Sequence, residues 1–109
     1  MSRWAGHVKG TKEFDRIYRK LKPSSPERRV VDSAPEKVKL NMMLGDKIQR
    51  PQWPPYYVRK YGISNLWKFN MSKGARLVYT LLSENGYWVV VVLEMFLTHK
   101  EYEKRFGYC

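Results

Sequence analysis

A chain of 109 residues, 43% of them apolar and 15% aromatic, is long enough for one folded domain over residues 1–109 and too apolar for a disordered basic tail. It carries 21 Lys and Arg against 10 Asp and Glu, a formal charge of +11, which predicts binding to a polyanion: nucleic acid, an anionic membrane surface or an acidic protein. One cysteine excludes an internal disulfide, and two distant histidines predict no metal site. No apolar run suits a signal peptide or a membrane span, so we expect a cytoplasmic protein.

The N-terminal segment predicts a short strand followed by a helix. Residues Ala5–Lys9 suit a first strand weakly, and Gly10-Thr11 reads as a break followed by an N-cap. Apolar side chains then recur at the i, i+3, i+4 and i+7 spacing of one helix face, at Phe14, Ile17, Tyr18 and Leu21. The prolines of residues 23–26 end this helix.

A second helix is predicted to begin near Ser33, because Ser33 and Glu36 have capping-box spacing and Pro35 falls in the first turn. Whether residues 26–31 form a separate helical turn stays open. The apolar face of this helix is expected at Leu40, Met43, Leu44 and Ile48, and its lysines are Lys37, Lys39 and Lys47. Three prolines within residues 51–55 then exclude a regular helix or a central strand there.

The second half of the chain changes to a period of two, which is typical of strands. Residues 67–71 and 75–81 each alternate between apolar and polar side chains, with a turn at residues 72–74. Asn85-Gly86 is a strong hairpin signal, and Tyr87–Phe96 is apolar on both faces, as a central strand should be. Thr98 is placed to cap a last helix that runs through Lys104.

These elements predict an α+β fold with the order β-α-α-β-β-β-α. We expect a small sheet that contains an antiparallel three-stranded meander, with the helices packed on one face of it. The alternation puts the bulky side chains of Trp67, Phe69, Leu77 and Tyr79 on the face that the helices cover. Lys68 and Arg76 then lie on the opposite, open face, beside the segment Thr98–Tyr102 that follows the central strand.

A His, a Lys, an Arg and a Tyr on one open face suit phosphodiester cleavage without a metal. Arg and Lys can stabilise the negative phosphorane, His can act as acid or base near neutral pH, and Tyr can stack on a base or assist proton transfer. Each residue also has an ordinary structural interpretation. A lone Lys or Arg is usually solvated, His99 suits a helix cap, and Tyr102 suits the core. Trp53 and Tyr56-Tyr57 suit core packing better than base stacking.

Two segments resemble one toxin superfamily. Gly74–Tyr79 is similar to the G-x-R-L-V-Y strand of RelE/ParE-type toxins, and Leu97–Tyr102 closely resembles the T-H-K-E-Y segment of the HigB branch. The helix at Thr11–Leu21 and the predicted element order are also similar to those of the family. The resemblance implies a RelE-like fold and a toxin of a type II toxin–antitoxin system that cuts mRNA on the ribosome, without metal or cofactor.

The resemblance also implies roles for single residues. Arg76 stands where the family has its phosphate-stabilising arginine. His99 is the candidate acid or base, and Tyr102 is the C-terminal tyrosine of the motif. Lys68 matches a basic residue of the family less closely. Contacts to mRNA or rRNA are expected from other polar residues, which are Lys100, Lys73, Asn70, Lys37, Lys39 and Lys47.

The charge is unevenly spread along the chain. Residues 1–60 hold 15 of the 21 basic residues and 6 of the 10 acidic ones, so the surplus there is +9. We expect this half to dock on rRNA or on a cognate acidic antitoxin rather than on a membrane. Two alternatives remain: a ParE-like or diverged toxin that acts by protein binding alone, and a basic RNA- or DNA-binding module.

Overall fold

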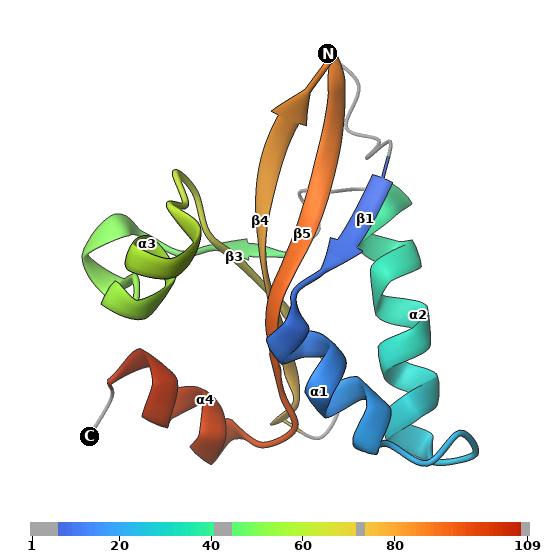
Figure 1. Ribbon diagram of the computed structural model, residues 1–109. Helices are drawn as coiled ribbons and strands as arrows, with labels where there is room; N and C mark the ends of the chain where they lie inside the picture. The colour runs from blue at the N-terminus through green and yellow to red at the C-terminus, as the bar shows by residue number, and fades with distance from the viewer. Residues whose placement is uncertain (1–6, 41–44, 72–73, 108–109) are drawn as a thin grey trace.

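The computed structural model describes residues 7–40, 45–71 and 74–107, and these form an α+β fold around a five-stranded open sheet (Figure 1). The strands are β1 (His7–Gly10), β2 (Asp46–Lys47), β3 (Trp67–Asn70), β4 (Arg76–Glu84) and β5 (Tyr87–Phe96). The helices are α1 (Lys12–Lys20), α2 (Pro26–Leu40), α3 (Pro55–Tyr61) and α4 (His99–Phe106), with a short 3-10 helix, η1, at Arg50–Gln52. The predicted α+β class is confirmed.

The sheet has the strand order β1-β5-β4-β3-β2. The pairs β5–β4, β4–β3 and β3–β2 are antiparallel, so the predicted meander of β3, β4 and β5 is confirmed. The first strand joins β5 in parallel, which makes β5 a central strand with neighbours on both sides. This position explains its run of β-branched residues.

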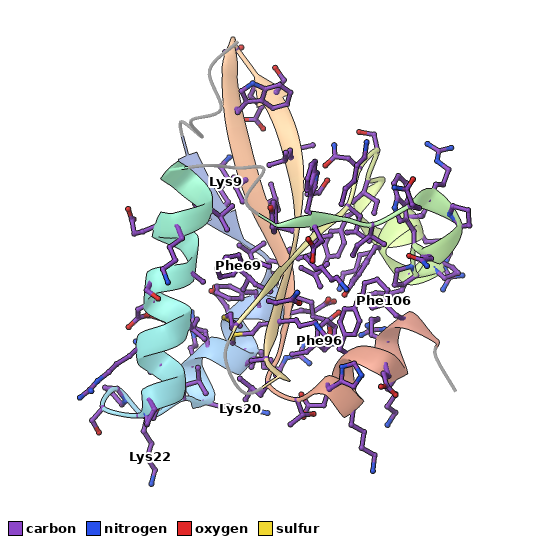
Figure 2. The ribbon with its side chains drawn as sticks, turned by 180° about the vertical axis from the view of Figure 1, so that it is seen from behind. Lys9, Lys20, Lys22, Phe69, Phe96 and Phe106 are labelled. Carbon is purple, nitrogen blue, oxygen red and sulfur yellow. The ribbon has the colours of Figure 1, made fainter. Side chains whose placement is uncertain are left out.

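Helices cover both faces of the sheet, which corrects the expectation that they would pack on one face. Figure 1 shows α1 and α2 on one side of β4 and β5, and α3 and α4 on the other. Figure 2 shows Phe69 on the α2 side and Phe96 and Phe106 on the α4 side. A second buried cluster accounts for the difference, since Tyr57 of α3 and Phe106 of α4 pack with Val78 and Leu93 of the sheet. The apolar character of Tyr87–Phe96 on both faces agrees with a covered second face, but strand alternation does not identify the helices that cover it.

The first helix follows the sequence prediction closely. The Thr11 side chain accepts a hydrogen bond from the backbone N–H of Phe14 at 3.2 Å, which caps the helix. The predicted apolar face packs toward β5, beside Val92 and Met95. The helix ends at Lys20, before the proline-containing turn.

The second helix begins earlier than predicted. Ser25 supplies the N-cap, because its hydroxyl accepts a hydrogen bond from the backbone N–H of Arg28 at 3.1 Å and Pro26 takes the first helical position. Ser33 therefore lies in the middle of a 15-residue helix, and Pro35 is an interior residue. The helix is capped by the serine–proline pair at 25–26 and not by Ser33 and Glu36. Ile48 lies beyond the helix, while Met43 and Leu44 fall outside the described residues.

Residues 46–63 hold elements that the predicted order lacks. The short strand β2, the 3-10 helix η1 and the helix α3 all lie here, so β-α-α-β-β-β-α is incomplete. Proline does not prevent α3, because Pro55 occupies the first turn, where a missing N–H costs little. The expected core role of the aromatic residues is confirmed for Tyr57, which is fully buried.

The hairpin between β4 and β5 has the predicted turn and an unpredicted bulge. Asn85 and Gly86 both have positive φ, as this turn requires. In the register of the pair, Val78 lies opposite Glu94 and Tyr79 lies opposite Val92, so Leu93 is an extra residue. The bulge brings Glu94 to the α3/α4 face, where it contacts Tyr57.

Within residues 7–40, 45–71 and 74–107, none of the helices combines the length and the apolar character needed to cross a membrane.

Candidate functional site

The predicted reactive residues meet where the beginning of β4 lies beside the beginning of α4. Arg76 is paired in register with Phe96, the last residue of β5, and α4 starts three residues later at His99. Thr98 caps α4 as predicted, since its hydroxyl accepts a hydrogen bond from the backbone N–H of Glu101 at 3.2 Å. Strand register and helix cap together fix the position of His99 relative to Arg76.

The imidazole of His99 bridges a cation and a carboxylate. Its Nδ1 lies 2.5 Å from Nη1 of Arg76, and its Nε2 forms a contact with the carboxylate of Glu103, one helical turn further on. A guanidinium can only donate, so Nδ1 must be the acceptor and Nε2 must carry the hydrogen that Glu103 accepts. The geometry therefore selects the neutral Nε2–H tautomer of His99. The side chain is 55% exposed, so a ligand can reach it.

Tyr102 is a buried support for the cations of the site. It is 2% exposed, stacks on Phe106 with ring centroids 4.4 Å apart, and meets Phe96 edge to face. The guanidinium carbon of Arg76 lies 4.5 Å from the centroid of the Tyr102 ring, and Nζ of Lys68 lies 5.5 Å from it. Both cations gain from the electron-rich ring face. A base cannot stack on a ring that is covered in this way.

The predicted strand alternation is confirmed for Lys68. In the register of β3 and β4, Lys68 lies opposite Val78 and Asn70 lies opposite Arg76, so all four share one face. Lys68 therefore reaches Tyr102 from the same side as Arg76. The structure thus brings together Arg76, His99, Lys68 and Tyr102.

Asn70 and Asp46 hold Arg76 from the side opposite His99. Nε of Arg76 donates to Oδ1 of Asn70 at 3.0 Å, and Nδ2 of Asn70 donates to Oδ2 of Asp46 at 3.3 Å. Strand β2 brings Asp46 into place because Gly45 allows close contact: a Cβ there would lie 2.3 Å from the backbone oxygen of Lys68. Hydrogen bonds with Asn70 and His99, together with the Tyr102 ring, thereby hold Arg76 in place.

Two residues of the site were missed by sequence reasoning. Glu103 carries a recognisable signal, its i+4 spacing from His99 within one helix. Asp46 carries none, because its place depends on the pairing of β2 with β3.

The residues predicted to contact RNA do not form one surface. Lys100 is exposed beside His99, and Asn70 bonds to Arg76 as described. Lys37 and Lys39 belong to α2, which packs on the other face of the sheet, and Lys47 lies opposite Trp67, whose side chain packs on that other face too. Lys73 lies outside the described residues.

A second polar cluster joins α3, β5 and α4. The Tyr57 hydroxyl donates to Glu94 at 2.6 Å, and Arg105 donates to both carboxylate oxygens of Glu94, at 3.0 and 3.2 Å. Burial and the neighbouring Glu94 carboxylate raise the pKa of Tyr57 above its ordinary value, so the phenol stays protonated. This cluster fixes α4, and with it His99 and Tyr102, against the sheet.

The described residues contain no group of three or more His, Cys, Asp or Glu side chains arranged to hold a metal ion. The comparisons with known proteins identify no relative. No family model matches the sequence, and searches of curated proteins and of solved structures find no match.

Proposed function

We propose that this chain is a metal-independent endoribonuclease of the RelE/HigB kind, a toxin that cuts mRNA on the ribosome. The observation that carries the proposal is the meeting of Arg76, Lys68 and His99 around Tyr102, with Arg76 and His99 in direct contact. The resemblance of Gly74–Tyr79 and Leu97–Tyr102 to the family's segments supports the same assignment.

The first step is capture of the scissile phosphate. Arg76 and Lys68 supply two positive charges that are held by the Tyr102 ring, and Arg76 is further oriented by Asn70. A phosphate oxygen is a stronger acceptor for a guanidinium than a neutral imidazole nitrogen. Binding of RNA therefore draws Nη1 of Arg76 away from His99 and leaves Nδ1 of His99 unoccupied.

The freed Nδ1 then acts as the general base. It takes the proton of the 2′-hydroxyl, the 2′-oxygen forms a bond to phosphorus, and the bond from phosphorus to the 5′-oxygen breaks. Glu103 accepts the Nε2–H and stabilises the imidazolium that forms. Arg76 and Lys68 stabilise the phosphorane, a proton from solvent completes the 5′-hydroxyl, and the His99 imidazolium then releases its proton to solvent. The products are a 2′,3′-cyclic phosphate and a 5′-hydroxyl end.

The formal charge of +11 supports docking on rRNA and mRNA and pairing with a cognate acidic antitoxin in the cytoplasm. An acidic antitoxin segment would neutralise the surplus while the toxin is stored.

A second candidate is a toxin that acts by protein binding alone, as ParE-like members do. One observation favours it: both ring nitrogens of His99 are occupied and Tyr102 is buried. In this alternative Arg76, His99 and Glu103 serve to anchor α4 rather than to react with RNA.

The test expresses the chain in bacterial cells and maps new 5′-hydroxyl ends in translated mRNA. Cleavage is expected with the wild type and is expected to fall by about a hundredfold or more in Arg76→Ala and His99→Ala. Lys104→Ala, a change of one exposed cation of α4, is the matched control and should cleave normally. Growth arrest with intact mRNA would favour the binding-only toxin. Equal cleavage by Arg76→Ala/His99→Ala would refute the proposed site.

A further inference from the structure

A pocket that shares no residue with the Arg76–His99 site opens between η1 and α3. Its volume is about 410 Å³, and its lining consists of Arg50, Trp53, Pro55, Val58, Arg59 and Ile63. Ile63 forms a buried part of the wall, and Val58 is 45% exposed. An apolar side chain left in water at the mouth of a pocket is typical of a binding surface.

The pocket also carries uncompensated positive charge. Among the described residues, its lining includes two arginines and no carboxylate. Across residues 7–40, 45–71 and 74–107, neither Arg50 nor Arg59 forms an ion pair. The guanidinium of Arg50 lies over the Trp53 ring, 5.1 Å from its centroid, and no other described residue accepts a hydrogen bond from it. An anionic ligand with an apolar part complements this combination.

The polar groups of the pocket favour a peptide over a nucleobase. A stacked base needs an open aromatic face, and Arg50 already covers one face of Trp53. The indole N–H of Trp53 is also used, since it donates to the backbone oxygen of Ile48 at 2.9 Å. The apolar wall would leave the polar edge of a base without partners, which costs free energy. An aliphatic or aromatic side chain meets no such cost, and carboxylates fit the forked N–H groups of arginine.

We propose that this pocket binds an acidic segment of a partner protein, with one large apolar side chain inserted between Val58 and Ile63 and flanking carboxylates on Arg50 and Arg59. The site stands apart from the proposed nuclease activity, because binding here needs neither Arg76 nor His99. It assigns a function to the η1–α3 region, which the nuclease proposal does not use.

The first experiment selects a displayed library of random peptides against the full chain. We expect enrichment of sequences in which Asp and Glu surround one Leu, Ile, Phe or Trp. Enrichment of neutral or basic sequences, or no enrichment, would overturn the proposal.

The second experiment measures the affinity of an enriched peptide, made synthetically, by fluorescence anisotropy. Val58→Asp and Arg59→Glu are each expected to weaken binding by about tenfold or more. Both positions are exposed, so the fold should tolerate the changes. The matched control is Arg29→Glu, an equal charge reversal at an exposed position of α2, and it should bind within about twofold of the wild type.

Two further arms separate the alternatives. Arg76→Ala/His99→Ala should bind the peptide as the wild type does, so this proposal and the nuclease proposal can fail independently. A single-stranded oligouridine should compete poorly at physiological salt. If Val58→Asp and Arg59→Glu lower the affinity for oligouridine but leave that for the peptide unchanged, the pocket is a nucleic-acid site. If Arg29→Glu weakens peptide binding as much as Arg59→Glu, only the total charge matters.

Discussion

The two faces of the sheet differ in how their side chains are held. On the α1/α2 face the buried sheet residues are almost entirely apolar: Leu77, Tyr79, Leu81, Val90, Val92 and Met95. On the α3/α4 face, polar and charged groups lie among the apolar ones, and several of them are hydrogen-bonded. Thr80 donates to Asn65 at 2.7 Å, and Glu94 accepts from Tyr57 and Arg105.

This difference separates a face held by apolar contacts from a face on which directional polar contacts are added to the apolar ones. Apolar contacts are non-directional, so many side chains of similar volume can fill the first face. Hydrogen-bonded groups need particular partners at particular distances, so the second face specifies where α4 lies. Among the described residues, the cations and the imidazole of the candidate site lie only on this second face.

The largest expected effect comes from a cavity in the apolar face. Leu77 is fully buried against α2 and Met95, so Leu77→Ala should lower the free energy of unfolding by about 3 kcal/mol. Urea denaturation followed by circular dichroism measures it. The matched control is Leu82→Ala in the same strand, where the side chain is 38% exposed and the loss should stay below about 1 kcal/mol. Equal losses at both positions would mean that the face is not close-packed.

Breaking the polar cluster of the other face comes next. Glu94→Ala leaves the Tyr57 hydroxyl and the Arg105 guanidinium without their shared carboxylate, at a cost of about 2–3 kcal/mol. In a Tyr57→Phe variant, Glu94→Ala should lower the free energy of unfolding by less, because the hydroxyl that would lose its acceptor is already absent. A double-mutant cycle in urea measures the coupling. Strict additivity would show that the two groups do not act together.

Sequence reasoning succeeded on the first face and was incomplete on the second. Alternation in residues 67–81 identified the side chains facing α2, and local signals placed Thr11, Asn85-Gly86 and Thr98. It also put Lys68 and Arg76 on one face, because a period of two assigns each strand residue to a face of the sheet regardless of which helices cover that face. Helix α3, strand β2 and the bulge at Leu93 depend on contacts between distant segments, and no periodic pattern reports them.

The pH dependence of stability tests another polar contact, the one between Glu13 of α1 and residues of α3. Burial raises the pKa of Glu13, but hydrogen bonds from Lys60, Tyr56 and Tyr61 outweigh it and hold the pKa below its usual 4.5. Glu13 therefore stabilises the fold above the unfolded-state pKa, and this part is lost as the pH falls through the lower, folded-state pKa.

Glu13→Gln should thus cost about 1–2 kcal/mol at neutral pH, with the gap to the wild type closing as the pH drops below about 4. Urea denaturation across this pH range gives the difference. Asp15→Asn, an exposed change in the same helix, serves as the control and should give a smaller gap. If the difference in stability between Glu13→Gln and the wild type widened in acid, folding would raise the pKa of Glu13 rather than lower it.

The smallest effect on stability is expected at Glu103, and it probes the candidate site directly. The contact between His99 and Glu103 is solvent-accessible, so Glu103→Ala should change the free energy of unfolding by less than about 0.5 kcal/mol. The same change removes the acceptor for Nε2–H and should shift neutral His99 toward the mixed tautomers of an unrestrained imidazole. Nitrogen-15 chemical shifts of the ring measure this population. Glu103→Gln keeps an acceptor oxygen and should preserve the tautomer.

Arg76→Ala acts on the other ring nitrogen and should shift the tautomer in the same direction, because it removes the donor to Nδ1. Arg76→Ala also removes the hydrogen bond to Asn70 and the contact with the Tyr102 ring, so it should lower the free energy of unfolding by more than Glu103→Ala does. A His99 tautomer that is indifferent to both substitutions would mean that α4 alone orients the ring. A tautomer that depends on both would show that the exposed end of the polar face is set by the same kind of directional contact that holds Glu94 in its interior.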